Sequence, residues 1–262
     1  MVEQIMNSQS SESLMRARLR ASMQACGVDA GLIAFGVEAL DARLGGGLAQ
    51  AALHEIYAAA SPDAASAAAF ALLLAWRASD GRPILWVREE AGVRRNGKPY
   101  GHGLTELGMT PDSLFLIDAP DTIAALQAGA DITRCGAIGA VIIELTGKAA
   151  ALDLTASRRL SLSARQTGVT ALVLRTDAEP TPSAAHTRWR VASAPSTPLP
   201  ANAPGYPAFE VTLLRHRGGI AGIEARLEWN RDRQCFDQAP LSGGVPVVVA
   251  GGTGQAVERR AA

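Results

Sequence analysis

The chain has 262 residues, of which 48% are apolar and 19% are charged. This length suffices for one α/β domain of ordinary size or at most two small ones, and the composition excludes a disordered chain. The 25 basic and 25 acidic residues cancel, so the whole chain lacks the strong positive charge typical of nucleic-acid-binding proteins.

The cysteines and the first residues indicate a cytoplasmic protein. Cys26, Cys135 and Cys235 are scattered without a CxxC spacing, which disfavours metal clusters and disulfide frameworks and fits a reducing compartment. The start, MVEQIMNSQSSES, is polar and does not resemble a secretory signal. The most apolar predicted helix, residues 64–76, is shorter than the roughly 20 residues that span a bilayer. We therefore expect no membrane function.

The N-terminal segment contains one amphipathic helix. Residues 13–24 place Met15, Leu19 and Met23 on one side of a helix. This side either packs on the main domain or binds a partner, so the three residues are candidate partner contacts. We expect residues 1–34 to form this helix and a linker, and residues 27–47 to be irregular.

Strand and helix patterns then alternate along the chain. Apolar runs predict strands at residues 53–57, 83–87, 114–117, 140–145 and 170–174. One helix is predicted to begin near Pro62, and a short helix is predicted to end within residues 104–108. Two further helices are predicted at residues 121–135, with Asp121 as N-cap, and at residues 153–167. This order predicts a doubly wound α/β fold: a mostly parallel sheet with helices on both faces.

The pattern changes after residue 176. Residues 176–185 are predicted to form a loop. Strands are predicted at residues 187–191, 209–213 and 223–229, and the last two alternate apolar and polar side chains, which indicates a C-terminal antiparallel hairpin. The core is expected to span residues 35–237, and residues 238–262 are expected to be a flexible tail.

Residues 54–76 have the layout of a phosphate-binding loop without its chemistry. In the motif G-x-x-x-x-G-K-[ST], backbone N–H groups and a lysine hold the phosphates and a hydroxyl holds Mg²⁺. The first Gly position is Ala58, and the Gly-Lys-Thr positions are Asp63, Ala64 and Ala65. Either these residues are a vestigial nucleotide loop, or the segment is an ordinary strand–turn–helix.

The start of the following helix also opposes anion binding. Ser61 is predicted as its N-cap and Pro62 as its first helical residue. Pro62 has no N–H to donate, and Asp63 places a negative charge where a phosphate would lie. We therefore predict that no nucleotide cofactor and no metal ion is bound.

Two segments resemble RecA in order and spacing. The stretch FGVEALDARLGGGLAQAALHEIY resembles the entry to the RecA core, and LGMTPDSLFLIDAPDTIAALQAGADITRCGAIGAVIIE resembles the region that ends in its Walker B strand. The similarity covers about residues 35–229 and is most specific over 118–144. It implies a RecA-like fold in which Glu144 is a vestigial Walker B acid and Glu90 falls near the water-activating Glu of RecA.

A RecA-like chain that lacks the ATP site resembles the ImuA group, and the HTRWRV segment supports this. The resemblance implies a non-catalytic accessory role in SOS-induced, error-prone translesion synthesis. The implied partners are a Y-family-like polymerase homologue of the ImuB type, RecA and the error-prone replicative polymerase. DNA would be contacted only indirectly or weakly, because the loop at residues 176–185 contains no Lys or Arg.

Two other functions fit parts of the sequence. A SulA-type cell-division inhibitor, which binds the tubulin-like division protein, is also RecA-like and lacks a P-loop. An enzyme is the other alternative, but no G-x-S-x-G or Cys–His signature is present. The four histidines, His54, His102, His186 and His216, lie far apart in sequence and are each expected at the surface or the core edge.

Three groups of arginines are candidate partner contacts. They are Arg188 and Arg190 around Trp189, Arg215 and Arg217 around His216, and Arg158, Arg159 and Arg165 on one predicted helix. Such groups can bind single strands or partners, although a solvated face paired with acidic residues explains them more simply. The alternation of a strand predicts that Trp189 points into the core and that both flanking arginines face outward.

Overall fold

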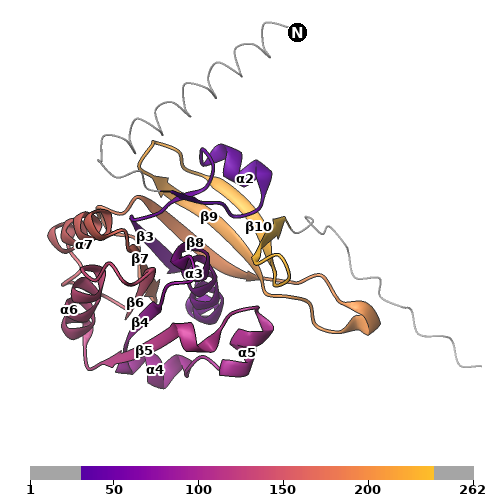
Figure 1. Cartoon of the computed structure of the whole chain (residues 1–262), viewed down its shortest axis with the longest axis horizontal. Helices are drawn as coiled ribbons and strands as arrows, with labels where there is room; N and C mark the ends of the chain where they lie inside the picture. The colour runs from indigo at the N-terminus through magenta and orange to yellow at the C-terminus, as the bar shows by residue number, and fades with distance from the viewer. Residues whose placement is uncertain (1–30, 239–262) are drawn as a thin grey trace, which may run out of the picture.

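The computed structural model describes residues 31–238. A nine-stranded sheet forms its centre, in the order β11-β10-β9-β8-β3-β7-β6-β4-β5 (Figure 1). The parallel strands are β3 (Leu53–Ala58), β4 (Ile84–Glu89), β5 (Leu114–Ala119), β6 (Ala140–Thr146), β7 (Thr170–Thr176) and β8 (Thr187–Ala194). Because these strands are parallel, strands that are consecutive in the chain are connected by crossovers, as a doubly wound fold requires.

Helices cover both faces of these parallel strands. On one face lies α3 (Ala64–Ser79), and on the other lie α6 (Thr122–Thr133) and α7 (Leu154–Thr167) (Figure 1). Two short helices, α4 (Glu90–Asn96) and α5 (Gly101–Glu106), follow β4. The central strands are apolar on both sides because both faces are covered. The predicted fold class is therefore confirmed.

Local sequence signals set the helix boundaries. The carboxylate of Asp121 accepts a hydrogen bond from the N–H of Ala124 at 2.8 Å, so the predicted N-cap is confirmed. Asp153 caps α7 in the same way, through the N–H of Ala156 at 2.7 Å. The helix α3 ends at Ser79, because the next residue, Asp80, takes a left-handed backbone conformation with φ of 50°.

An antiparallel extension completes the sheet. It contains β9 (Ala208–His216), β10 (Ile223–Asn230) and β11 (Cys235–Gln238), and β9 pairs with β8. The predicted hairpin is confirmed as β9 and β10, while β11 was not expected. Phe236 on β11 is fully buried, with its ring centroid 5.1 Å from that of Trp229, so this short strand closes the aromatic part of the core.

The expectation that residues 27–47 are irregular is wrong within the described residues. Leu32–Ile33 (β1) pairs with Leu48–Ala49 (β2), and α2 spans Glu38–Arg43. The helix forms because Leu40 is buried against the core and because the Asp41 carboxylate accepts the N–H groups that precede the helix, at 2.7 and 3.0 Å.

Several expectations concern parts of the chain that the structure does not describe. The helix with Met15, Leu19 and Met23 lies outside the described residues, as does the tail beyond residue 238. Between residues 31 and 238, no helix is long and apolar enough to cross a membrane.

Candidate functional site

The turn after β3 is fixed by contacts within the protein. Ala58 ends the strand, and the N–H of Ala59 donates to the carbonyl of Val191 on β8 at 2.8 Å. The carboxylate of Asp63 accepts the N–H and the hydroxyl of Ser193, at 2.9 and 2.8 Å. The turn after β3 is therefore attached to β8 at the place where a phosphate would lie.

The predicted helix start is wrong in detail. Ser61, Pro62 and Asp63 form a 3₁₀ turn, and α3 begins at Ala64. Ser61 does not cap the helix, because its hydroxyl donates to the carboxylate of Asp177 instead. Pro62 precedes α3 rather than opening it. Neither Ala64 nor Ala65 brings a polar side chain to this end of the helix.

The carboxylate at the vestigial Walker B position is neutralised by an arginine. Glu144 is 1% exposed, and one of its oxygens accepts the Nε of Arg88 at 2.8 Å. Asn96 donates to the other oxygen at 3.4 Å, and Arg88 also donates to the carbonyl of Gly97 at 2.8 Å. A metal ion at Glu144 would have to displace Arg88, because both are cations that need the same carboxylate.

A pocket of about 360 Å³ lies between this ion pair and the start of α3. Ala64, Ala65, Trp86 and Tyr100 contribute to its walls, with Arg88 and Glu144. This is where a nucleotide would bind in a RecA-like protein. However, Glu144, the one carboxylate in the lining, is paired with Arg88, and Asp63 places a negative charge just before α3.

The two acidic residues after β4 differ in environment. Glu90, which the resemblance to RecA sets near the water-activating position, is exposed and forms a surface ion pair with Arg94 at 3.1 Å. Its neighbour Glu89 is buried and accepts the hydroxyl of Thr122 at 2.5 Å and the N–H of Thr146 at 3.2 Å. Glu89 therefore connects α6 and β6 to β4. No local sequence signal distinguishes this buried glutamate from its exposed neighbour Glu90.

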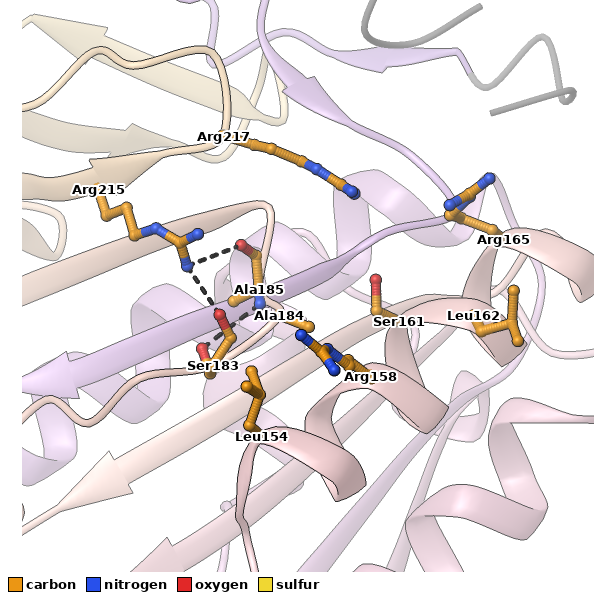
Figure 2. Close-up of a pocket in the computed structure, with 10 residues that line it drawn as sticks. All are labelled: Leu154, Arg158, Ser161, Leu162, Arg165, Ser183, Ala184, Ala185, Arg215 and Arg217. Carbon is orange, nitrogen blue, oxygen red and sulfur yellow. Dashed lines mark hydrogen bonds between the residues drawn. The ribbon is translucent and has the colours of Figure 1, made fainter. Parts of the chain in front are cut away.

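A second pocket joins arginines that are far apart in sequence. Its volume is about 350 Å³, and Figure 2 shows the side chains of α7 on one side and those at the end of β9 on the other. Its lining is Leu154, Arg158, Ser161, Leu162, Arg165, Ser183, Ala184, Ala185, Arg215 and Arg217. None of these ten residues is acidic. Two of the predicted basic groups thus form one site, and we refer to it as the arginine pocket.

The floor of the arginine pocket is held by hydrogen bonds. Arg215 donates to the carbonyl of Ser183 at 2.9 Å (Figure 2). The N–H of Ala184 donates to the hydroxyl of Ser157 on α7 at 3.1 Å. The segment before β8 is therefore attached to both walls, so the pocket is formed without a ligand. Arg159, on the same helix, is exposed and is not part of the lining.

Comparison with known proteins identifies the family. No protein-family model matches the chain. Two curated proteins, both described as Protein ImuA and both from Caulobacter vibrioides (strains NA1000 and ATCC 19089), are 32% identical over 207 residues. Each match covers 73% of this chain and 81% of the relative. The chain belongs to the ImuA family.

A solved structure supports the fold of this ImuA family member. The crystal structure of the RadB recombinase matches with a TM-score of 0.53 and 17% identity, over 79% of this chain and 100% of that chain. At this identity the likeness concerns the fold, and it confirms a RecA-like recombinase architecture. Membership of the ImuA family supports a role in damage-inducible mutagenesis.

The predicted outward orientation of Arg188 in this ImuA-family chain is wrong. Arg188 does not face solvent: its Nε donates to Glu55 on β3 at 2.7 Å, and its Nη2 donates to the hydroxyl of Ser183 at 3.0 Å. The pairing of β3 and β8 sets Glu55 beside Arg188, and the preceding loop covers both. Arg190 is exposed as expected, and Trp189 is fully buried in the core.

Three histidines are brought together by the same strands. The ring centroid of His186 lies 5.9 Å from that of His54 and 4.9 Å from that of His216. His54 is fully buried, so its predicted place at the surface or the core edge is wrong. Burial lowers the pKa of His54 to about 4 and that of His186 to about 3. Between residues 31 and 238, no group of three or more His, Cys, Asp and Glu side chains is arranged to hold a metal ion.

The bonding of His54 also fixes its neutral form. Its Nε2 lies 2.9 Å from the carbonyl of Ala49, which can only accept, so this nitrogen carries the proton. Its Nδ1 therefore accepts from the hydroxyl of Thr187 at 2.7 Å, and that oxygen in turn accepts the indole N–H of Trp189 at 2.9 Å. The histidines thus serve the packing of the core.

Proposed function

We propose that this ImuA-family chain is a non-catalytic accessory protein in SOS-induced, error-prone translesion synthesis. It acts by binding the ImuB-type, Y-family-like polymerase homologue, with RecA and the error-prone replicative polymerase as further candidate partners. The protein works in the cytoplasm and contacts DNA only through the assembled complex. Membership of the ImuA family supports the proposed role in damage-induced mutagenesis.

One observation carries the non-catalytic part. Both places where a RecA-like protein would hold Mg²⁺-nucleotide are used for bonds within the chain, Asp63 with Ser193 and Glu144 with Arg88. Breaking the Arg88–Glu144 pair to admit a nucleotide would leave a buried charge without its partner, which is costly. The fold is thus available as a scaffold for protein contacts.

Co-purification tests the proposal. The full-length chain is immobilised and offered the purified ImuB-type partner, with Mg²⁺-ATP and without nucleotide. We expect equal capture in both conditions, because no step of the interaction uses the nucleotide. Capture that requires ATP, or no capture at all, would contradict the proposal.

A test in cells separates the SulA-type alternative. Overproduction of the chain in undamaged cells is expected to leave cell length unchanged, whereas a division inhibitor would produce filaments. Deletion of the chain is expected to lower the frequency of damage-induced mutation. Membership of the ImuA family favours this outcome.

A further inference from the structure

No acidic side chain lines the arginine pocket. Arg158 and Arg165 come from α7, and Arg215 and Arg217 from the end of β9, with no acidic residue among the ten that line the pocket. Like charges gathered in a concave surface raise the local positive potential and attract anions. The formal charge of the whole chain is zero, so this potential is local and does not serve to attract a polyanion from a distance.

Apolar side chains flank the arginines. Leu154 and Leu162 on α7 are 39% and 52% exposed. With Arg158 between them they form a stripe at i, i+4 and i+8, about 12 Å long at the rise of an α-helix. Exposed leucines of this size next to arginines are typical of a surface that receives both apolar and acidic side chains of a protein partner.

The composition of the lining disfavours nucleic acid as the occupant. Binding of single strands relies on aromatic side chains on which bases stack, and the arginine pocket contains none. The two leucines would add nothing to contacts with a phosphate backbone. Arginine forks bind carboxylates in pairs of parallel hydrogen bonds, which gives both affinity and orientation.

We propose that the arginine pocket is a docking site for an acidic, amphipathic segment of a partner protein. The carboxylates of the segment pair with Arg158 and Arg217, and its apolar residues pack on Leu154 and Leu162. The segment around Ser183 at the base of the pocket is already fixed by its hydrogen bond with Arg215. Little conformational entropy of the pocket is therefore lost on binding, which favours affinity. This inference rests on the proposed accessory function, because it names the surface through which a partner binds.

Charge reversal tests the site, with a matched control. The test variant is Arg158→Glu with Arg217→Glu, which leaves Arg215 and its bond to Ser183 in place. The control variant is Arg134→Glu with Arg231→Glu, two exposed arginines outside the pocket and outside the candidate partner contacts. Both variants change the net charge equally, and thermal melts of both establish that they fold.

The first measurement uses the ImuB-type partner. We expect the test variant to lose at least about tenfold in affinity for it and the control variant to lose less than about twofold. If the test variant binds as well as the unmodified chain, the assignment of the pocket is overturned and the accessory function stands. If the unmodified chain itself does not bind, the accessory function fails, and the second measurement decides the site alone.

The second measurement uses two fluorescent probes with the unmodified chain and both variants. One is a helical peptide of alternating Glu and Leu pairs, with a Gln-for-Glu version as its control, and the other is an oligothymidine. We expect the unmodified chain and the control variant to bind the acidic peptide in a salt-sensitive manner, and the test variant to lose this binding. The Gln version of the peptide should bind the unmodified chain more weakly. Absence of peptide binding overturns the proposal, as does an oligothymidine affinity that the test variant alone loses.

Discussion

At the scale of single residues, the central feature is a buried charge that is satisfied by the protein itself. The side chains of Arg88 and Glu144 are 3% and 2% exposed, and their ion pair lies between β4 and β6. Arg88 also lies over the ring of Trp86, 5.0 Å from its centroid. A pair this buried is costly to break, because either partner alone would be an uncompensated charge in the core.

Removing one partner of this pair is therefore expected to destabilise the fold. Glu144→Leu should lower the free energy of unfolding by about 3–5 kcal/mol, because Arg88 stays buried without its carboxylate. The double variant Arg88→Met with Glu144→Leu should recover most of this loss. Urea denaturation of the three proteins gives the comparison. Equal destabilisation in the single and double variants would show that the pair is not the cause.

The buried histidines predict a pH dependence of stability. The pKa of His54 is about 4 when folded, against 6.5 as its ordinary value. Below pH 6.5 the unfolded chain takes up a proton that the folded chain excludes, so stability falls as the pH is lowered towards about 4. The slope contributed by His54 approaches about 1.4 kcal/mol for each pH unit in this window and is absent above it.

Unfolding free energies measured from pH 7 to pH 4.5 test this dependence. The variant His54→Gln can keep the donor to Ala49, and it should show a shallower slope by about one proton. Identical slopes in the unmodified chain and His54→Gln would contradict the assignment.

At the scale of secondary-structure elements, β8 joins the two halves of the sheet. It pairs in parallel with β3 and in antiparallel with β9. Its two faces differ in chemistry, since Trp189 packs on Phe35 and Phe70 while Arg188 pairs with Glu55. The junction therefore depends on one large aromatic residue and one buried ion pair.

Truncation of that aromatic residue is expected to be strongly destabilising. Trp189→Ala should cost about 3–5 kcal/mol of stability, because it leaves a cavity in a fully packed core. Arg190→Ala, one residue on and exposed, should change stability by less than about 0.5 kcal/mol. Denaturant unfolding of both variants measures the difference, and similar losses in the two would contradict the described orientation of β8.

The elements that the sequence predicted well are those with a strong local signal. β6 and β7 are apolar on both faces. α6 and α7 begin after Asp121 and Asp153, whose carboxylates accept the capping hydrogen bonds and whose positions are readable from the sequence. The short elements α2 and β11 carry too few residues for a periodic pattern. Leu40 and Phe236 stabilise them through contacts with distant parts of the chain.

The candidate sites were less predictable, because they depend on which elements meet. The arginines of α7 and of β9 were visible as two separate groups, and only the fold places them around one pocket. Alternation along β8 correctly set Arg188 opposite Trp189, but it could not show that Glu55 and a loop cover that face. Charged residues inside apolar strands, such as Arg88 and Glu55, were the available signal for buried pairs.

At the scale of the whole molecule, a RecA-like architecture remains without the groups that hold a nucleotide. The parallel strands and their helices form the expected sheet, while Ala64 and Ala65 stand where a lysine and a hydroxyl would be needed. The arginine pocket lies elsewhere, between α7 and the end of β9 (Figure 2). This separation fits a protein whose fold is used to present a surface to partners.

Nucleotide binding by the purified full-length chain tests this account most directly. The chain is titrated with a fluorescent ATP analogue and Mg²⁺, with unlabelled ATP as competitor, and the variant Ala64→Lys is measured in parallel. The account predicts no competable binding to either protein up to millimolar concentrations, because Asp63 and the paired Glu144 remain in the variant. Competable binding at micromolar concentrations by the unmodified chain would contradict it and would favour an active enzyme.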